Sequence, residues 1–333
     1  MRIGLFLIVL ALLGAAAFEG LRQGVYEAEG PLRDAAIVEV PVGASVARIA
    51  ERLEERGVIS SAMAFETAAR LRGDAGRIKA GDYEIEAAAS LRAVLDALVE
   101  GRAVEHRITI AEGLTTAEAL ALVEASPVLT GEITEKPREG ALAPDTYFVR
   151  RGETRQAVVE RMAAAQARIL AEAWAGREEG LPITSPVEAL ILASIIEKET
   201  GVPSERREVA SVFINRLRKG MRLETDPTVI YGITRGAGPL GRRLTRADVR
   251  APTDYNTYTI SGLPPTPIAN PGRASIEAAL DPAETDYLFF VADGTGGHAF
   301  AKTYDGHRRN VAVWRRIRAA QDQAAAEAEA GGG

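Results

Sequence analysis

The chain has 333 residues, which is enough for about two domains of ordinary size. Apolar residues make up 47% and charged residues 26%, so the chain is neither largely disordered nor a multi-span membrane protein. The formal net charge of −6 argues against a general nucleic-acid binder, because neutralising phosphates requires a concentrated basic surface. The chain has no cysteine, which excludes disulfides, thiolate metal sites and cysteine nucleophiles.

The first segment, from Ile3 to Phe18, has no charged or strongly polar residue. A helix of this length covers about 24 Å, less than the ~30 Å hydrocarbon core of a bilayer. Two interpretations compete. The segment is either a signal peptide cleaved after small residues near Ala17, or an uncleaved anchor over residues 1–21. Both predict that the rest of the chain works outside the cytoplasm.

Residues 22–35 carry mixed charges, two glycines and a proline, so we expect a linker there. Strand and helix patterns follow from residue 36 to residue 110. The expected strands are 37–41, 81–85 and 104–110, and the expected helices follow Ser45, start at Ser61, and cover 91–98. This order predicts a small α+β module over residues 36–110.

The remainder, residues 111–322, is predicted to form a larger α+β domain. Its first part has the pattern of helix, loop and helix, with the loop at 139–147 and a long helix over 155–180. Residues 323–333 are of low complexity and are predicted to be a flexible tail. The fold class expected for the whole chain is therefore α+β.

A strong helix-start signal stands at Ser185, Pro186 and Glu188, where the serine caps the helix and the glutamate completes a capping box. The helix that follows is apolar on all sides as far as Glu197, so it should be buried. A carboxyl at the end of such a helix should be partly desolvated. Desolvation would raise the pKa of the Glu197 carboxyl and suit a proton donor.

Two glutamates end this helix, and their directions differ by about 200°. Glu197 stands over Ala193 and Ser194, whose small side chains leave room for a ligand. Glu199 projects over Leu192 and a neighbouring isoleucine, a side that suits packing against protein. The alternative interpretation is that both glutamates simply begin the solvated end of the helix.

Polar residues beside strong turn signals lie further along the chain. Asp226 is a plausible N-cap for a short helix, with Pro227 in its first turn. Tyrosines flank Asn256 just before a proline-rich loop, which is stiff enough to hold side chains for binding. Tyrosines next to amides and hydroxyls suit a sugar, although a turn with surface tyrosines is the alternative. The residues predicted to line one groove with Glu197 are Asn215, Thr225, Asp226, Tyr231, Tyr255, Asn256 and Tyr258.

Other chemistries find no support in the sequence. The three histidines show no metal-ligand spacing, and the HExxH, GxSxG and Walker motifs are absent. The glycine-rich stretch 293–297 lies between two strand patterns and predicts a hairpin turn. His298 after that turn is expected to be structural.

The run from Leu192 to Gly232, LASIIEKETGVPSERREVASVFINRLRKGMRLETDPTVIYG, closely resembles the endolytic murein transglycosylase family, also called YceG-like proteins. The similarity continues through APTDYNTYTISGLPPTPIANPG and FFVADGTGGHAF. The resemblance implies a single-pass inner-membrane protein with its catalytic region in the periplasm, and a LysM-like module at residues 36–110. It also places the essential glutamate of the family on Glu197. The loop EGALAPDTY departs from the family pattern.

The resemblance implies that the chain cleaves peptidoglycan glycan strands between N-acetylmuramic acid and N-acetylglucosamine. Glu197 would protonate the glycosidic oxygen and then accept a proton from the muramoyl C6 hydroxyl, which attacks C1 and leaves a 1,6-anhydro end. Neither metal nor cofactor is implied. Penicillin-binding peptidoglycan synthases are expected partners.

Two other functions remain open. A muramidase-type hydrolase would need a second acid, for which Asp226 is the best candidate, and would leave a reducing end. A non-enzymatic scaffold would bind peptidoglycan through the N-terminal module without shortening the strands.

Overall fold

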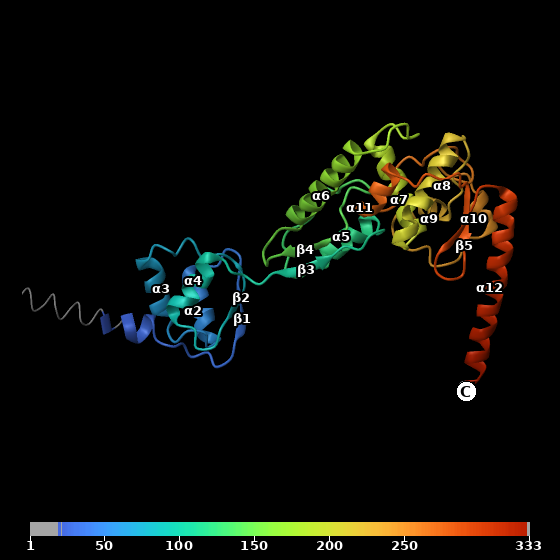
Figure 1. The fold of residues 1–333 in the computed structure, drawn as a ribbon. Coiled ribbons are helices and arrows are strands. Elements are labelled where there is room, and N and C mark those ends of the chain that lie inside the picture. The colour runs from blue at the N-terminus through green and yellow to red at the C-terminus, as the bar shows by residue number, and fades with distance from the viewer. Residues whose placement is uncertain (1–18, 21, 332–333) are drawn as a thin grey trace, which may run out of the picture. The chain divides into compact units, whose positions relative to one another are not determined.

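The computed structural model describes residues 19–20 and 22–331 (Figure 1). The described part is α+β, as the sequence predicts, with many helices and three two-stranded sheets. It divides into two compact units. The first unit holds the described residues up to Arg107 together with Ser126–Gly131 and Phe148–Thr154. The second holds Ile108–Ala125, Glu132–Tyr147 and the described residues from Arg155 onward.

The anchor expected over residues 1–21 lies almost wholly outside the described residues. The described chain contains no helix that is both long and apolar enough to span a bilayer. It enters the first unit through a short π-helix, Arg22–Tyr26.

The first unit contains the predicted small module. Its elements are β1 (Ala36–Val40), α2 (Val46–Glu55), α3 (Ala62–Leu71), β2 (Gly81–Ile85) and α4 (Leu91–Glu100). The two strands pair antiparallel, with Val38 opposite Tyr83. Each helix begins at a serine whose Oγ accepts a hydrogen bond from the backbone N–H three residues later, which satisfies one free amide of the first turn. The apolar faces of strands and helices share one core.

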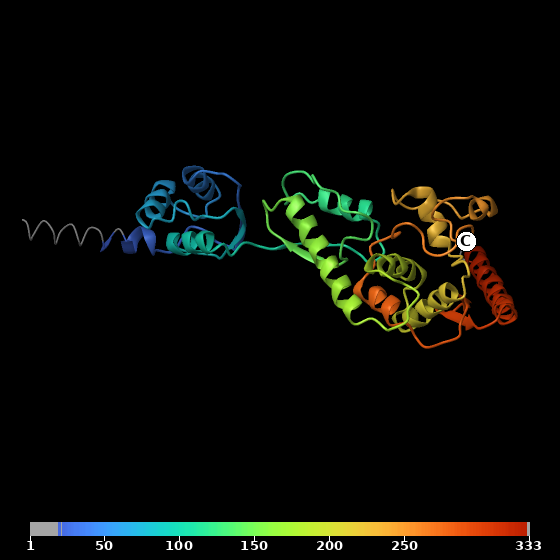
Figure 2. The ribbon, with the colours of Figure 1, turned by 90° about the horizontal axis from the view of Figure 1, so that it is seen from above.

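The second unit contains the longer run of elements. In chain order they are β3 (His106–Thr109, which starts at the unit boundary), α5 (Thr116–Glu124), β4 (Thr146–Val149), α6 (Arg155–Ala175), α7 (Pro186–Glu199), η2 (Pro203–Glu205), α8 (Arg206–Arg218), α9 (Asp226–Thr234), α10 (Arg246–Arg250), α11 (Arg273–Leu280), β5 (Phe289–Ala292), β6 (His298–Ala301) and α12 (Tyr304–Gly331). Strand β3 pairs with β4, and β5 pairs antiparallel with β6 around the predicted glycine-rich turn. Figure 2 shows α6 as the long yellow-green helix of this unit.

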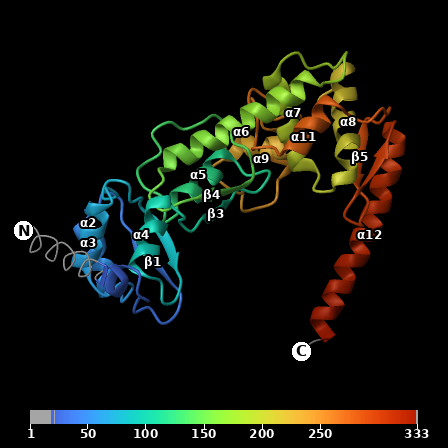
Figure 3. The ribbon, with the colours of Figure 1, turned by 60° about the vertical axis from the view of Figure 1, so that its left-hand side comes forward.

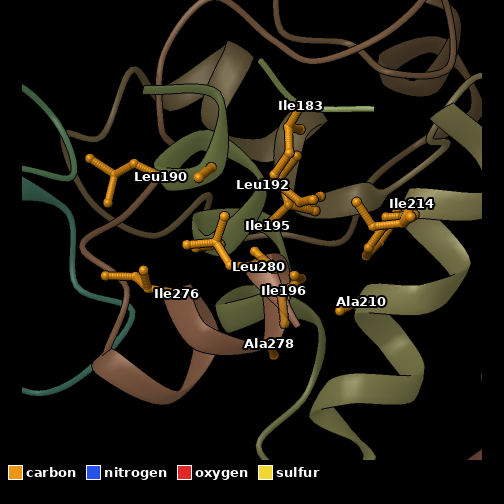
Figure 4. Close-up of a cluster of buried hydrophobic side chains, with 14 of the residues drawn as sticks. Ile183, Leu190, Leu192, Ile195, Ile196, Ala210, Ile214, Ile276, Ala278 and Leu280 are labelled. Carbon is orange, nitrogen blue, oxygen red and sulfur yellow. The ribbon is translucent and has the colours of Figure 1, made fainter. Parts of the chain in front are cut away.

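Helix α7 lies at the centre of the second unit, as its all-round apolar sequence predicts. Leu192, Ala193, Ile195 and Ile196 are fully buried. They pack with side chains of α8 and α11 in a single cluster, shown in Figure 4. Burial on every side fixes the direction of the helix and therefore the positions of the two glutamates at its end.

The start of α7 differs in detail from the expected capping box. Ser185 Oγ accepts from the Glu188 N–H at 3.2 Å, as predicted. The Glu188 carboxylate, however, accepts from the N–H and the hydroxyl of Thr184 and not from the N–H of Ser185. The Glu188 carboxylate therefore binds Thr184, the residue before the N-cap serine.

Several elements of the second unit were not predicted, α12 among them. Strand β4 includes the end of the expected 139–147 loop, and the short helices α10 and α11 fall in segments with little periodicity. Helix α12 packs against β5 (Figure 3) and extends to Gly331, into the segment expected to be a flexible tail. The flexibility of that tail stays a prediction.

Candidate active site

A cavity of about 430 Å³ opens beside the C-terminal end of α7. Glu199, the last residue of α7, lines it together with Thr225, Asp226 and Tyr258. The other lining residues, which come mainly from α8, β5 and α12, are Phe213, Arg216, Leu223, Glu224, Phe289, Phe290, Val291, Tyr304 and His307. The volume lies in the range of small-molecule sites, and the lining combines aromatic rings with a few polar groups.

Glu199 is a carboxyl of this cavity whose pKa is raised by its surroundings. Burial raises its pKa, although the hydrogen bond that it accepts from the Thr225 hydroxyl opposes the rise. The negative charge of Asp226 raises the pKa further, and positive charge on His298 lowers it. A carboxyl with a raised pKa keeps its proton at higher pH than usual and can act as a general acid.

Asp226 and Tyr258 form a second polar pair in the cavity. The Tyr258 hydroxyl donates to Asp226 Oδ1 at 2.8 Å. Burial, followed by this bond and the charge of Asp226, raises the pKa of the Tyr258 phenol. Asp226 is therefore not the N-cap that its spacing suggested. Helix α9 is capped at Thr225 without a side-chain hydrogen bond, and the Asp226 carboxylate faces the tyrosine.

Buried threonines hold Thr225 in place. Its backbone N–H donates to Thr257 Oγ1 at 3.0 Å, and Thr257 Oγ1 lies 2.8 Å from Thr228 Oγ1. Thr228 in turn donates to the Thr225 carbonyl at 2.7 Å. Because Thr228 and Thr257 are fully buried, the hydroxyl that reaches Glu199 is held by a rigid support.

Arg216 of α8 supports another wall of the cavity. Its nearly buried guanidinium donates to the carbonyls of Leu288, Arg222 and Leu223 at 2.7 to 3.0 Å, and to the Glu224 carboxylate at 3.1 Å. Glu224 itself adopts a left-handed backbone with φ of 53°, which is costly for a residue other than glycine. Backbone strain directly before Thr225 and Asp226 is typical of a functional site.

Glu197 lies in different surroundings. Its Oε2 accepts from the Gly272 N–H at 2.9 Å. Nearby, burial and the charge of Glu197 raise the pKa of Glu112. Glu197 is half-buried, as Glu199 is, but it does not line the cavity that contains Glu199.

The side of α7 beneath Glu197 has no room for a ligand, contrary to the expectation from its small residues. Ala193 and Ser194 are fully buried. Ser194 Oγ accepts from the Ile268 N–H at 3.0 Å, because the segment that precedes α11 packs over this side. The other side of the helix, expected to pack against protein, is where Glu199 meets the cavity.

The remaining predicted groove residues have other neighbours. Tyr231 donates from its hydroxyl to Glu139 Oε2 at 3.1 Å, and its ring lies 4.9 Å from that of Tyr255. Asn256 is fully buried and donates to two backbone carbonyls of the α10 region. Asn215 donates to the carbonyls of Thr285 and Tyr287 and lines a separate cavity of about 550 Å³. The structure thus gathers Thr225, Asp226 and Tyr258 around Glu199.

The 139–147 loop is fastened to the segment that covers Ser194. Asn270 is fully buried; its Oδ1 accepts from the Leu142 N–H at 2.9 Å, and its Nδ2 donates to the Leu114 carbonyl at 3.0 Å. Glu139 at the start of the loop accepts from the Thr116 N–H at 2.7 Å. These contacts give the loop a structural role.

Within residues 19–20 and 22–331 no group of three or more histidine, aspartate or glutamate side chains is arranged to hold a metal ion. The polar groups that line the cavity are carboxyl, hydroxyl, phenol, imidazole and guanidinium groups, beside aromatic rings.

Sequence reasoning did not anticipate Glu199, Arg216, Phe289, Tyr304 and His307 in this cavity. The signal for Glu199 was present, since it ends the same buried helix two residues after Glu197. Strand β5 and helix α12 supply lining residues only because segments distant in the sequence pack together. No local sequence pattern indicates such packing.

These features define an α+β protein whose larger unit carries a cavity with a desolvated carboxyl. The YceG-like family matches residues 38–313, and the chain belongs to this family. The endolytic murein transglycosylase of Bacillus subtilis is 32% identical over 303 residues, which cover 82% of this chain and 82% of that protein. The endolytic murein transglycosylase of Streptococcus pneumoniae is 28% identical over 360 residues, covering 92% of this chain and 64% of that longer protein.

A solved structure is also similar. The 2.6 Å crystal structure of a YceG-like protein from Listeria monocytogenes matches with a TM-score of 0.52 and 30% sequence identity. The match covers 83% of this chain and 98% of that one. The likeness therefore extends across nearly the whole of the Listeria protein.

Proposed function

We propose that this chain is an endolytic lytic transglycosylase of peptidoglycan. It cleaves the bond between N-acetylmuramic acid and N-acetylglucosamine inside glycan strands, leaves a 1,6-anhydro end and so terminates strand elongation. Family membership and the activity named for its Bacillus and Streptococcus relatives support this proposal. The single observation that carries it is a carboxyl with a raised pKa in a cavity of sugar-compatible size and lining.

One carboxyl is sufficient for this reaction. It donates its proton to the glycosidic oxygen as the bond to the muramoyl C1 breaks. As the muramoyl C6 hydroxyl attacks C1, the resulting carboxylate takes up the hydroxyl proton, which restores the acid. No water is consumed, and the nucleophile comes from the substrate itself.

Two glutamates compete for this role. The sequence predicts Glu197, and that assignment stays a prediction. The geometry favours Glu199, because burial raises its pKa, a fixed threonine orients it, and it borders the cavity. Glu197 instead accepts a backbone hydrogen bond from Gly272 beside the packed segment 268–272.

A muramidase-type hydrolase is the second candidate function. The observation that favours it is the nearness of Asp226, whose charge acts on Glu199 in the same cavity. Two carboxyls on one cavity could share the tasks of acid and of base or nucleophile, as in ordinary glycosidases.

Mass spectrometry of the products tests the proposal. The soluble chain from about residue 30 is incubated with purified glycan strands, and the new ends are identified. A transglycosylase releases anhydro ends, whereas a hydrolase releases reducing ends that are heavier by one water. Strands that stay intact would contradict both enzymatic functions and favour a binding scaffold.

We also propose that residues 1–21 anchor the chain in the inner membrane by a single span, with the catalytic region in the periplasm. The apolar run from residue 3 to residue 18 supports this. Recovery from cells of a mature chain that begins near Phe18 would contradict the anchor.

We propose in addition that the first unit contains a LysM-like module, which the order β1–α2–α3–β2 supports. Penicillin-binding peptidoglycan synthases are proposed as partners of the whole protein.

A further inference from the structure

The cavity beside Glu199 has a second end that the cleavage step does not use. It is formed by Phe289 of β5 and by Tyr304 and His307 in the first turns of α12. The Phe289 ring is stacked on the His307 ring at 5.3 Å between centroids, and the Tyr304 ring meets Phe289 at 5.9 Å and 60°. Tyr304 is 62% exposed, so a large aromatic face stands at the rim of the cavity.

The His307 ring completes this aromatic cluster from α12. Its Nδ1 is buried and has no hydrogen bond within the part of the chain that the structure describes, so a ligand would meet the ring and not this atom. Burial and the charge of Arg216 lower the pKa of the His307 imidazole, which is therefore neutral at physiological pH. His307 thus adds a ring without a charge to this end of the cavity.

The charges around this end favour a neutral ligand. Glu199, Glu224 and Asp226 bring carboxyl groups to the cavity. The one guanidinium, that of Arg216, is already bonded to three carbonyls and to Glu224. An anionic group would meet carboxylates without a free cation, whereas sugar hydroxyls could donate to those carboxylates.

We propose that Phe289, Tyr304 and His307 form a subsite for a neutral N-acetylglucosamine ring of the glycan strand. The apolar face of the ring lies on the exposed Tyr304, beside the Phe289 and His307 rings. The muramoyl ring, which carries an acidic lactyl group or a peptide, occupies another part of the site. This inference rests on the proposed function and adds which sugar the α12 end of the cavity takes.

Binding of chitotetraose, a neutral N-acetylglucosamine oligomer, to the full chain in detergent tests the subsite. Calorimetry is done with Glu199→Gln as the background, so that no turnover intervenes. Tyr304→Ala should raise the Kd about fivefold, because ring stacking of this kind contributes on the order of 1 kcal/mol. Tyr304→Phe should keep the wild-type Kd, since the ring remains.

Matched controls separate the subsite from the fold. Arg308→Ala changes an exposed residue of α12 that does not line the cavity, and should leave the Kd unchanged. His307→Phe keeps a stacked ring and should also leave the Kd unchanged. Equal Kd values for Tyr304→Ala, Tyr304→Phe and Arg308→Ala would overturn the subsite.

The two proposals can fail separately. If the wild-type chain releases anhydro ends but Tyr304→Ala changes neither the Kd for chitotetraose nor the KM for strands, the subsite is wrong and the function stands. If Tyr304→Ala weakens chitotetraose binding but the wild-type chain cleaves no strands, the subsite stands and the enzymatic function is wrong.

Discussion

Glu197 and Glu199 stand two residues apart at the end of α7, yet the chain surrounds them differently. Segment 268–272 packs over the Glu197 side, where Ile268 and Gly272 donate backbone hydrogen bonds to Ser194 and Glu197. The Glu199 side faces a cavity built from the α9 start, β5 and α12. One glutamate is therefore bonded to the backbone of a packed segment, and the other borders a cavity with a raised pKa.

The difference teaches that small side chains on a helix do not by themselves make room for a ligand. Ala193 and Ser194 allow close approach, and the protein uses that space for its own backbone. A close approach of this kind lets Ser194 satisfy a buried N–H, which would otherwise be costly.

The largest change in stability should come from the hydrogen bonds of Arg216, which support the wall of the cavity on the Glu199 side. Arg216→Ala should lower the free energy of unfolding by about 3 kcal/mol or more, because three carbonyls and Glu224 lose a charged donor. Arg218→Ala, on the same helix but partly exposed, should cost at most about 1 kcal/mol. Urea unfolding of both variants measures the loss in free energy of unfolding. Equal losses for the two variants would show that the hydrogen bonds of Arg216 do not stabilise this side of the cavity.

A smaller loss should follow from the support on the Glu197 side. Asn270→Ala should cost about 2–3 kcal/mol, since the Leu142 N–H and the Leu114 carbonyl are left without their side-chain partner. Asn270→Asp keeps the acceptor for Leu142, but it places a carboxylate oxygen against the Leu114 carbonyl in a fully buried position, so it should cost at least as much as Asn270→Ala. Urea unfolding again provides the measurement, and an Asp variant more stable than the Ala variant would contradict this account of Asn270.

Stability as a function of pH should sharpen the contrast. Because the folded-state pKa of Glu199 is raised, the native chain keeps a proton that the unfolded chain releases above about pH 4.5. The contribution of Glu199 to the free energy of unfolding therefore falls as pH rises from there to the raised pKa. Glu199→Gln removes this titration, so its free energy of unfolding should rise relative to that of the wild type as pH rises, by about 1.4 kcal/mol per unit of pKa shift. Melting temperatures of the two proteins, measured as a function of pH, report this difference.

The control for that experiment is Glu197→Gln, which removes a carboxyl from the same helix end and so corrects for net charge. A gain for Glu199→Gln that stays constant between pH 4 and pH 8 would contradict the raised pKa of Glu199.

The smallest effect should be found at Glu197 itself. Gln at this position can still accept from the Gly272 N–H, so Glu197→Gln should change stability by less than about 1 kcal/mol. Glu197→Ala removes the acceptor and should cost about 1 kcal/mol. Thermal unfolding of the pair isolates the hydrogen bond, and identical melting temperatures would show that it contributes nothing.

Local signals predicted much of the fold. Serine caps and 3.6-residue periodicity placed the helices of the first unit, and an all-round apolar run predicted the burial of α7. Helix α11 was missed because it is short and begins at Gly272, without a side-chain cap. Strand β4 was missed because its pairing with β3 joins segments far apart in the sequence.

The site was predicted less completely than the fold. Proline and glycine turn signals near Thr225, Asp226 and Tyr258 indicated polar residues that line one cavity in the structure, and their role in substrate binding stays a prediction. The choice between two glutamates depends on which side of α7 segment 268–272 covers, and a helix position cannot indicate that. Tyr255 and Asn256 carried the same kind of polar signal, but their side chains support neighbouring loops.

The most direct test of the account compares strand cleavage by Glu199→Gln and Glu197→Gln under identical conditions, with melting temperatures confirming that both fold. If Glu199 is the acid and base, Glu199→Gln should lose at least about 10²–10⁴-fold in the rate of anhydro-end release, because the amide cannot donate and recover a proton. Glu197→Gln should retain measurable cleavage. A Glu199→Gln variant that cleaves near the wild-type rate, beside an inactive Glu197→Gln variant, would contradict the account and restore Glu197 to the role that the sequence predicts.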